Sequence, residues 1–209
     1  MPGLETSRPR RVVKLGGSLL DVPDLASRLR RWLQRQSEMC TLLVAGGGRL
    51  ADVLREADQL HRLGETASHW LCIRAMTIHA EMLAALLPEA RLLASIAEWR
   101  SRPATLSILD PWIFLREEER RFPGLTLPES WHATSDSIAA RISSCVDAAE
   151  LVLLKSKLPQ HEATLLDAAA DGFVDPLLPQ FGSGLPAIRS VNFRSDEFLE
   201  IAWRPHAPL

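Results

Sequence analysis

Two short apolar runs, each closed by glycines and followed by a helix-like segment, constrain what this 209-residue chain can fold into. The runs are Arg11–Leu15 and Thr41–Ala45, which end in Gly16-Gly17 and Gly46–Gly48. Apolar residues recur at helical spacing over 25–36 and again after the second glycine run. Strands that alternate with helices in this way are typical of parallel α/β units. We therefore expect an α/β fold with a mainly parallel sheet.

The rest of the chain continues the same pattern of short strands and helices. Helical spacing predicts three further helices, over 66–87, 134–146 and 163–170. Short apolar runs predict five further strands, at 90–95, 105–109, 151–154, 188–193 and 198–203. The pair Ser195-Asp196 predicts a turn between the last two. The pattern of residues 110–131 predicts no clear helix or strand, because prolines and a run of charged residues interrupt its apolar periodicity.

Charge and cysteine content exclude several classes of function. The 24 Lys and Arg residues against 26 Asp and Glu give a net charge of −2, so no global field would recruit nucleic acid or an anionic membrane. No apolar run is long enough to span a bilayer, and the first residues contain no apolar signal core. Cys40, Cys72 and Cys145 are too far apart to indicate a zinc site or a disulfide framework. We expect a cytoplasmic protein with no nucleic-acid or membrane partner.

Each glycine junction has the features of a phosphate-binding loop. Glycine lets backbone N–H groups approach anionic oxygens, and a following helix N-terminus adds amides and a positive dipole end. In a parallel sheet both junctions lie at the same edge, where Lys14 would add a cation. Taken alone, each junction is more typical of a plain turn, and neither has the GxxxxGK[ST] or GxGxxG spacing.

Two later segments admit a structural and a functional interpretation. In Thr134-Ser135-Asp136-Ser137, Thr134 and Ser135 are the predicted N-cap residues of the helix that follows. Asp136 either complements the helix dipole or serves as a carboxylate at a ligand cleft. Lys155, at the end of the apolar run 151–154, either extends to solvent or stabilises a transferring phosphoryl group. Two histidines are candidates for substrate binding: His69 on the predicted helix over 66–87, and His132 just before Thr134. Both are also compatible with ordinary packing, since helical spacing mostly marks a core and local sequence does not fix the direction of His132.

The order VVKLGGS, LLVAGGG, TSDSIAARIS and LVLLKS resembles the amino acid kinase family, which includes aspartate, glutamate and uridylate kinases. SHWLCIRAM at 68–76 and GFVDP at 172–176 are similar to a small branch that includes a kinase of methanofuran biosynthesis acting on an aminomethyl-furanyl-methyl phosphate. The resemblance implies a three-layer αβα sandwich around about eight strands. It also implies one domain, with an acceptor-side lobe over about 11–130 and a nucleotide-side lobe over about 131–209, and a homo-oligomer.

The resemblance further implies phosphoryl transfer from ATP, with Mg²⁺, to a phosphate or carboxylate group of a small molecule. Lys14 corresponds to the lysine that contacts the transferring phosphoryl group, Asp136 to the aspartate that organises the lysines, and Lys155 to the lysine on the nucleotide side. The implied phosphate- and nucleotide-binding residues are Gly16, Gly17, Ser18, Gly46, Gly47, Gly48, Ser135 and Ser156. No protein ligand for the metal is implied, because Mg²⁺ would arrive with ATP.

One stretch departs from the family pattern. Members often carry a VDG-type nucleotide loop after the LLK strand, whereas here KLPQHE occupies 157–162 and the pair Val174-Asp175 comes later. The departure leaves open an alternative of another class: a nucleotide- or phosphate-binding regulatory or storage protein that has lost transfer activity.

Overall fold

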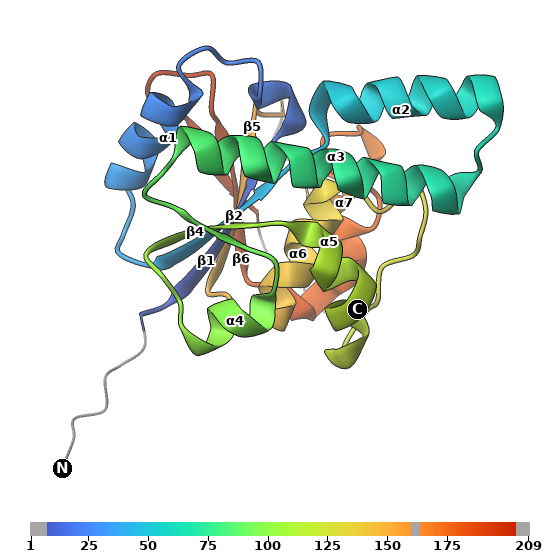
Figure 1. Cartoon of the computed structure of the whole chain (residues 1–209). Coiled ribbons are helices and arrows are strands. Elements are labelled where there is room, and N and C mark those ends of the chain that lie inside the picture. Colours follow the sequence, from blue (N-terminus) through green and yellow to red (C-terminus); the bar gives the residue numbers. More distant parts are fainter. Residues whose placement is uncertain (1–7, 160–163, 204–209) are drawn as a thin grey trace.

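The computed structural model of the chain describes residues 8–159 and 164–203. Within them, one seven-stranded sheet has the order β3-β4-β2-β1-β5-β6-β7 (Figure 1). All neighbouring strands pair in parallel except β6 and β7, which are antiparallel. The strands are β1 (Arg10–Leu15), β2 (Cys40–Ala45), β3 (Arg91–Leu93), β4 (Leu106–Leu109), β5 (Glu150–Lys155), β6 (Ala187–Asn192) and β7 (Glu200–Trp203). The predicted α/β fold is confirmed, with seven strands in the described residues rather than about eight.

Helices cover both faces of the sheet and make the three layers (Figure 1). The α-helices are α1 (Leu25–Gln34), α2 (Gly48–His61), α3 (Glu65–Leu86), α4 (Ile96–Ser101), α5 (Pro111–Ile113), α6 (Ser135–Cys145) and α7 (Leu165–Ala170). Because both faces are covered, β1, β2 and β5 are continuous apolar runs rather than alternating ones. Helices α2 and α3 run side by side and extend past the sheet, as Figure 1 shows.

Side-chain alternation along β1 and β5 decides which layer each lysine faces. Val12 and Leu151 belong to the core that α6 covers, whereas Val13 and Val152 belong to the opposite core against α1. Since alternate residues of a strand share a face, Lys14 and Lys155 both lie on the side of α6. The parallel register of β1 with β5 then brings these two lysines to the same edge of the sheet.

Three predicted elements differ from the structure for local reasons. The strand predicted over 90–95 ends at Leu93, because the Ser95 side chain caps α4, a helix that the sequence pattern did not predict. The strand predicted over 198–203 begins two residues later, at Glu200, and ends at Trp203. The helix predicted from about residue 163 begins at Leu165, and residue 163 itself lies outside the described part.

The segment 110–131 folds as short helical turns held by buried charges. After α5 come a π-helical turn, η2 (Phe114–Glu118), and a 3-10 turn, η3 (Glu119–Arg121). Arg141 of α6 donates to the carbonyls of Phe122 and Pro123 at 2.9 and 2.7 Å and pairs with Glu119 at 3.3 Å. These contacts come from distant parts of the chain, which explains why local pattern predicted no element here.

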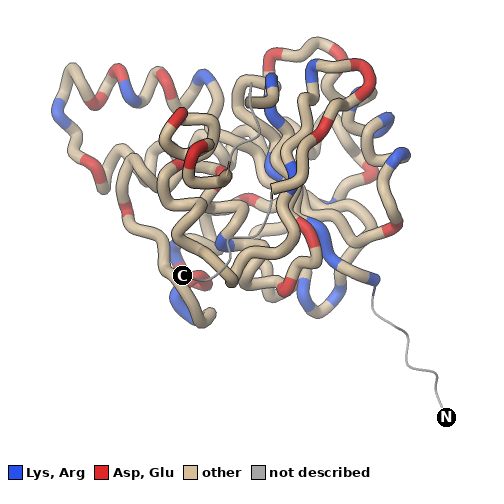
Figure 2. The backbone as a smooth tube through the Cα atoms, turned by 180° about the vertical axis from the view of Figure 1, so that it is seen from behind, with Lys and Arg blue, Asp and Glu red and all other residues tan. Residues whose placement is uncertain are grey.

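Lys and Arg residues are interspersed with Asp and Glu residues along the backbone (Figure 2). Within the described ranges, no helix combines the length and the apolar character needed to cross a bilayer.

Candidate active site

Lys14, Asp136 and Lys155 meet at the carboxyl edge of the sheet. Lys14 Nζ lies 2.8 Å from Oδ1 of Asp136, and Lys155 Nζ lies 2.6 Å from Oδ2 of the same carboxylate. Lys14 and Asp136 are almost fully buried, at 5 % and 4 % exposed, and Lys155 is half-buried. The structure therefore brings together the three residues predicted to be catalytic, although they come from β1, α6 and β5.

The ionisation of these groups reflects burial and mutual interaction. Burial alone would raise the pKa of Asp136, but Lys14 and Lys155 outweigh it and lower that pKa to about 2. Burial, together with Lys14, lowers the pKa of Lys155 to about 8, against the opposing effect of Asp136. The three side chains hold two positive charges and one negative, so an anion bound beside them would complete the charge balance.

The start of α6 is fixed by a residue that sequence reasoning did not identify as part of the site. Thr134 occupies the N-cap position, as predicted, but its side chain caps nothing. Instead Oδ2 of Asp175 accepts from the Thr134 N–H at 3.2 Å, the Thr134 hydroxyl at 2.8 Å and the Ser137 N–H at 2.9 Å. Asp175 is itself buried and also accepts from the hydroxyl of Ser137. It thus holds the helix turn that carries Asp136.

The same segment also holds Lys155. The backbone carbonyl of Phe173 accepts from Lys155 Nζ at 2.7 Å, and the Phe173 ring lies 5.1 Å from that ammonium. Residues 173–175 therefore anchor both the lysine and the helix of its carboxylate partner.

The two glycine junctions touch each other, and the contact requires glycine. A Cβ on Gly17 would lie 2.4 Å from the backbone nitrogen of Gly48, and one on Gly46 would lie 2.8 Å from that of Gly17. Gly48 also has a φ of +51°, which L-residues rarely adopt. The loops can pack this closely only without side chains.

Not all of the predicted loop amides are free to bind an anion. The Gly16 N–H donates to the Leu154 carbonyl, and the Gly46 N–H to the Leu15 carbonyl, each at 2.9 Å. The remaining N–H groups of the two loops have no hydrogen-bond partner in the described part of the chain; they belong to Gly17, Ser18, Gly47, Gly48, Arg49 and Leu50. The free donors therefore form two adjacent groups, at the starts of η1 (Gly17–Leu19) and α2.

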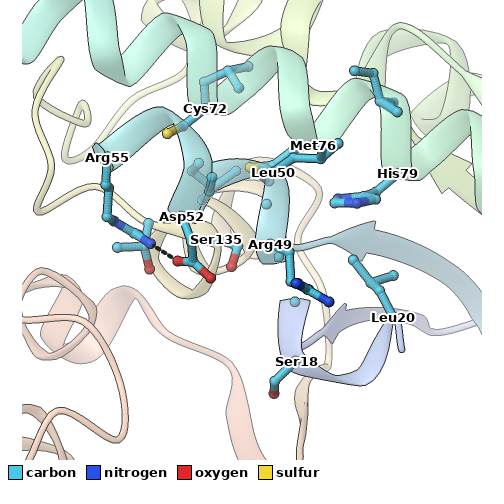
Figure 3. A pocket seen from close by; sticks show the side chains of 18 of the residues that line it. Ser18, Leu20, Arg49, Leu50, Asp52, Arg55, Cys72, Met76, His79 and Ser135 are labelled. Carbon is cyan, nitrogen blue, oxygen red and sulfur yellow. Dashed lines mark hydrogen bonds and ion pairs between the residues drawn. The ribbon is translucent and has the colours of Figure 1, made fainter. Parts of the chain in front are cut away.

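A cavity of about 800 Å³ opens from these free amides along α2 and α3 (Figure 3). Its lining includes both loops and, from α3, Ile73, Met76 and His79. Arg49, in the first turn of α2, projects into the cavity and pairs with no described residue. Sequence reasoning missed Arg49, although its place directly after three glycines at a helix start was a usable signal.

Of the other residues predicted to bind substrate or phosphate, some line the cavity and others lie outside it. His69 is buried in the cavity wall, with Nδ1 at 3.2 Å from the Ser130 carbonyl, and burial lowers its pKa. Ser135 also lines the cavity, whereas His132 is exposed and is not among the lining residues. Ser156 follows β5 at the same edge of the sheet, half-buried.

The donor set fits phosphate groups better than a directly bound metal. Free amides, two lysines and loops without side chains suit anionic oxygens. In the described residues, no group of three or more His, Cys, Asp or Glu is placed to hold a metal ion. Any Mg²⁺ would therefore depend mainly on phosphate oxygens and water for its ligands.

Comparison with known proteins assigns the family. The model of the amino acid kinase family matches residues 9–157, which is more than half of the chain. The chain therefore belongs to the amino acid kinase family. The match spans all four motifs in full, and the confirmed fold agrees with it.

Individual relatives are more distant. The [5-(aminomethyl)furan-3-yl]methyl phosphate kinase of Methanocaldococcus jannaschii is 26 % identical over 154 residues, which cover 68 % of this chain and 63 % of that protein. The uridylate kinase of Archaeoglobus fulgidus has a similar structure, with a TM-score of 0.60 at 18 % identity over 86 % of this chain and 89 % of that one. The carbamate kinase of Giardia lamblia, solved with AMP-PNP, is also similar in structure, with a TM-score of 0.52 at 10 % identity. The match covers 94 % of this chain and 99 % of that one. The chain therefore spans less than two thirds of the Methanocaldococcus protein, and the solved structures show that the fold is shared.

Proposed function

We propose that this protein transfers a phosphoryl group from ATP to a phosphate or carboxylate group of a small molecule. The observation that carries the proposal is the arrangement of Lys14 and Lys155 on the two oxygens of buried Asp136, at the sheet edge where the glycine loops follow β1 and β2. Phosphoryl transfer needs positioning and charge stabilisation rather than covalent chemistry, and these groups supply both.

Each residue has a separate part in this mechanism. Asp136 keeps both lysines in place and charged. Lys14, in β1 just before the first glycine loop, would stabilise the equatorial oxygens of the transferring group, and Lys155 would neutralise charge on the nucleotide side. ATP bound with Mg²⁺ would supply the phosphoryl group. A phosphate or carboxylate acceptor is already ionised, so the site needs no general base.

The cavity along α2 and α3 suits the acceptor. Its loop end has free amides and the unpaired Arg49, which fit an anionic group, and its α3 wall has apolar Ile73 and Met76. We infer that residues 11–130 form the acceptor-side lobe and 131–209 the nucleotide-side lobe. The Methanocaldococcus relative supports an acceptor like the furan-based phosphate in its name. We propose that the reaction serves the synthesis of a methanofuran-type one-carbon cofactor.

Location and assembly are part of the same proposal. The family supports a cytoplasmic enzyme that works as a homo-oligomer. Exposed apolar side chains on α3, such as Leu71 and Ile78, offer a surface for association.

A turnover assay tests the function. The protein is incubated with ATP, Mg²⁺ and one acceptor at a time: the aminomethyl-furanyl-methyl phosphate, UMP, aspartate or carbamate. ADP release and the ³¹P spectrum of the product report transfer, which we expect with the furan phosphate. Arg49→Gln should raise the KM for the acceptor about tenfold while leaving the KM for ATP unchanged.

The alternative function is that of a regulatory or storage protein that binds a nucleotide or phosphate without transfer. The departure at 157–162 favours it, and part of that stretch lies outside the described residues. Tight ATP binding with no turnover on any of the four acceptors would support this alternative over the kinase.

A further inference from the structure

His79 of α3 contacts the second glycine loop from the side of the cavity (Figure 3). Its Nδ1 lies 2.9 Å from the carbonyl oxygen of Gly46, and its Cε1 lies 3.2 Å from where a Cβ on Gly48 would be. The residue is 8 % exposed, so the ring is held between α3 and the loop. None of the sequence motifs included it.

The contact with Gly46 decides the tautomer of the imidazole. A carbonyl oxygen can only accept a hydrogen bond, so Nδ1 must carry the hydrogen. Burial lowers the pKa of His79, against the opposing effect of the Gly46 hydrogen bond, and this favours the neutral ring. In the neutral ring with hydrogen on Nδ1, Nε2 has only a lone pair. The interaction with the loop therefore belongs to Nδ1 alone.

The same contact sets the direction of an amide that is free to bind an anion. The peptide between Gly46 and Gly47 is trans, so the Gly47 N–H points opposite to the Gly46 carbonyl. The Gly46 carbonyl accepts from the imidazole and from no backbone N–H of the described residues. With glycine on both sides, this peptide has more rotational freedom than others. Among the described residues, the imidazole is thus the hydrogen-bond donor that fixes the Gly46 carbonyl, alongside the packing of the two loops.

We propose that His79 is a positioning residue, which orients the Gly46–Gly47 peptide so that the Gly47 N–H is preorganised to bind an anionic phosphate oxygen. The advantage is entropic, because a loop already held in its binding orientation loses less freedom when the anion arrives. The inference rests on the proposed function only in taking this loop as the anion site. It does not require transfer activity.

The test uses binding of inorganic phosphate to the full-length chain labelled with ¹⁵N. Phosphate should shift the Gly47 and Gly48 amide signals of the wild-type protein. His79→Leu removes the donor and should weaken phosphate binding about tenfold, the worth of a good hydrogen bond. His79→Asn places an amide N–H at the position of Nδ1 and should stay within about twofold of wild type. His61→Leu, on the exposed end of α2, is the matched control and should change nothing.

His79→Gln separates this proposal from a role of the other ring nitrogen. Gln puts its amide at the position of Nε2, so it should behave like His79→Leu. Retained affinity in His79→Leu, or a Gln variant that binds better than the Asn variant, would overturn the proposal.

The wild-type protein provides a check that needs no variant to fold. Long-range ¹H–¹⁵N spectra should show hydrogen on Nδ1 of His79, and hydrogen on Nε2 alone would overturn the proposal. Phosphate that leaves the Gly47 signal unmoved would do the same. Phosphate binding here without any turnover would count against the kinase only.

Discussion

The ammonium of Lys155 lies 2.6 Å from the carboxylate of Asp136, yet the pKa of Lys155 falls to about 8. An ion pair at this distance would ordinarily raise a lysine pKa. Here burial and the neighbouring Lys14 outweigh the carboxylate, which is shared between two cations. An anionic ligand would supply the missing negative charge, so this site gains most from binding an anion while both lysines are charged.

The first prediction is a loss of activity in mild alkali. As the pH rises through about 8, Lys155 of the free enzyme loses its proton. We therefore expect kcat/KM for ATP to fall on a limb with an apparent pKa near that value. Lys155→Arg keeps a charge at every accessible pH and should remove the limb, even if the overall rate is lower. Exposed Lys157→Arg should keep it, and a limb unchanged in Lys155→Arg would contradict the assignment.

Stability should change in the opposite direction over the same range. Lys155 has a pKa of about 8 in the folded state and an ordinary value of 10.5 when unfolded. Between these values the unfolded chain binds more protons, so the contribution of Lys155 to the free energy of unfolding rises with pH. Urea denaturation of wild type and Lys155→Met at pH 7 and pH 10 isolates this contribution. The increase in the free energy of unfolding that Lys155 contributes between pH 7 and pH 10 should be absent from Lys155→Met.

Replacement of Lys14 tests the catalytic assignment directly. Lys14→Met should lower kcat about a hundredfold to a thousandfold, as loss of one preorganised electrostatic donor does. The variant should stay folded, because Asp136 keeps Lys155 as a partner. Steady-state kinetics and circular dichroism measure the two effects. Exposed Lys157→Met is the control, and a folded Lys14→Met protein with near-normal turnover would disprove the role of Lys14.

Local sequence pattern correctly predicted the strands β1, β2 and β5 and the glycine loops that follow β1 and β2 at the carboxyl edge of the sheet. Val12 and Leu151 belong to continuous apolar runs, which the sequence shows directly, and their parallel pairing follows from the helices between them. The order of the four motifs along the sequence was enough to identify the amino acid kinase family. These features depend on neighbours along the chain, where spacing is informative.

Features that depend on distant partners were not predictable in this way. Asp175 caps a helix that begins 40 residues earlier, whereas local spacing predicts a capping side chain at Thr134 or Ser135. Arg141 holds the turns of 110–131 through carbonyls that no periodicity marks. Whether Arg49 is free or paired likewise depends on which side chains surround it, and spacing does not contain that information.

The contact between the loops leads to a prediction for Gly17. In Gly17→Ala the new Cβ would lie 2.4 Å and 2.6 Å from the backbone N and Cα of Gly48, which cannot move like a side-chain end. The loops must separate, and a shift of about 1 Å at a phosphate site can cost about a hundredfold in rate. We expect kcat/KM and affinity for inorganic phosphate both to fall. Gly184→Ala is the matched control, with nothing within 4 Å of the new Cβ. Equal activity in the two variants would refute a close-packed pair of loops.

Asp175 should be important for stability as well as for the site. Its carboxylate accepts from Thr134 and Ser137 at the start of α6, and from the N–H groups of Leu177 and Leu178 at 3.1 Å each. In Asp175→Asn, an amide NH₂ group replaces one carboxylate oxygen and faces the N–H and O–H donors that the oxygen accepted from. The change also removes negative charge from the N-terminus of α6.

We expect this change to lower the free energy of unfolding by about 2–3 kcal/mol, measured by urea denaturation at pH 7. Because the α6 turn that carries Asp136 would loosen, kcat should fall as well. Asp171→Asn, an exposed change in the same segment, should stay within about 0.5 kcal/mol of wild type. If Asp175→Asn denatured at the same urea concentration as wild type, the hydrogen bonds of Asp175 would not be what holds α6 in place.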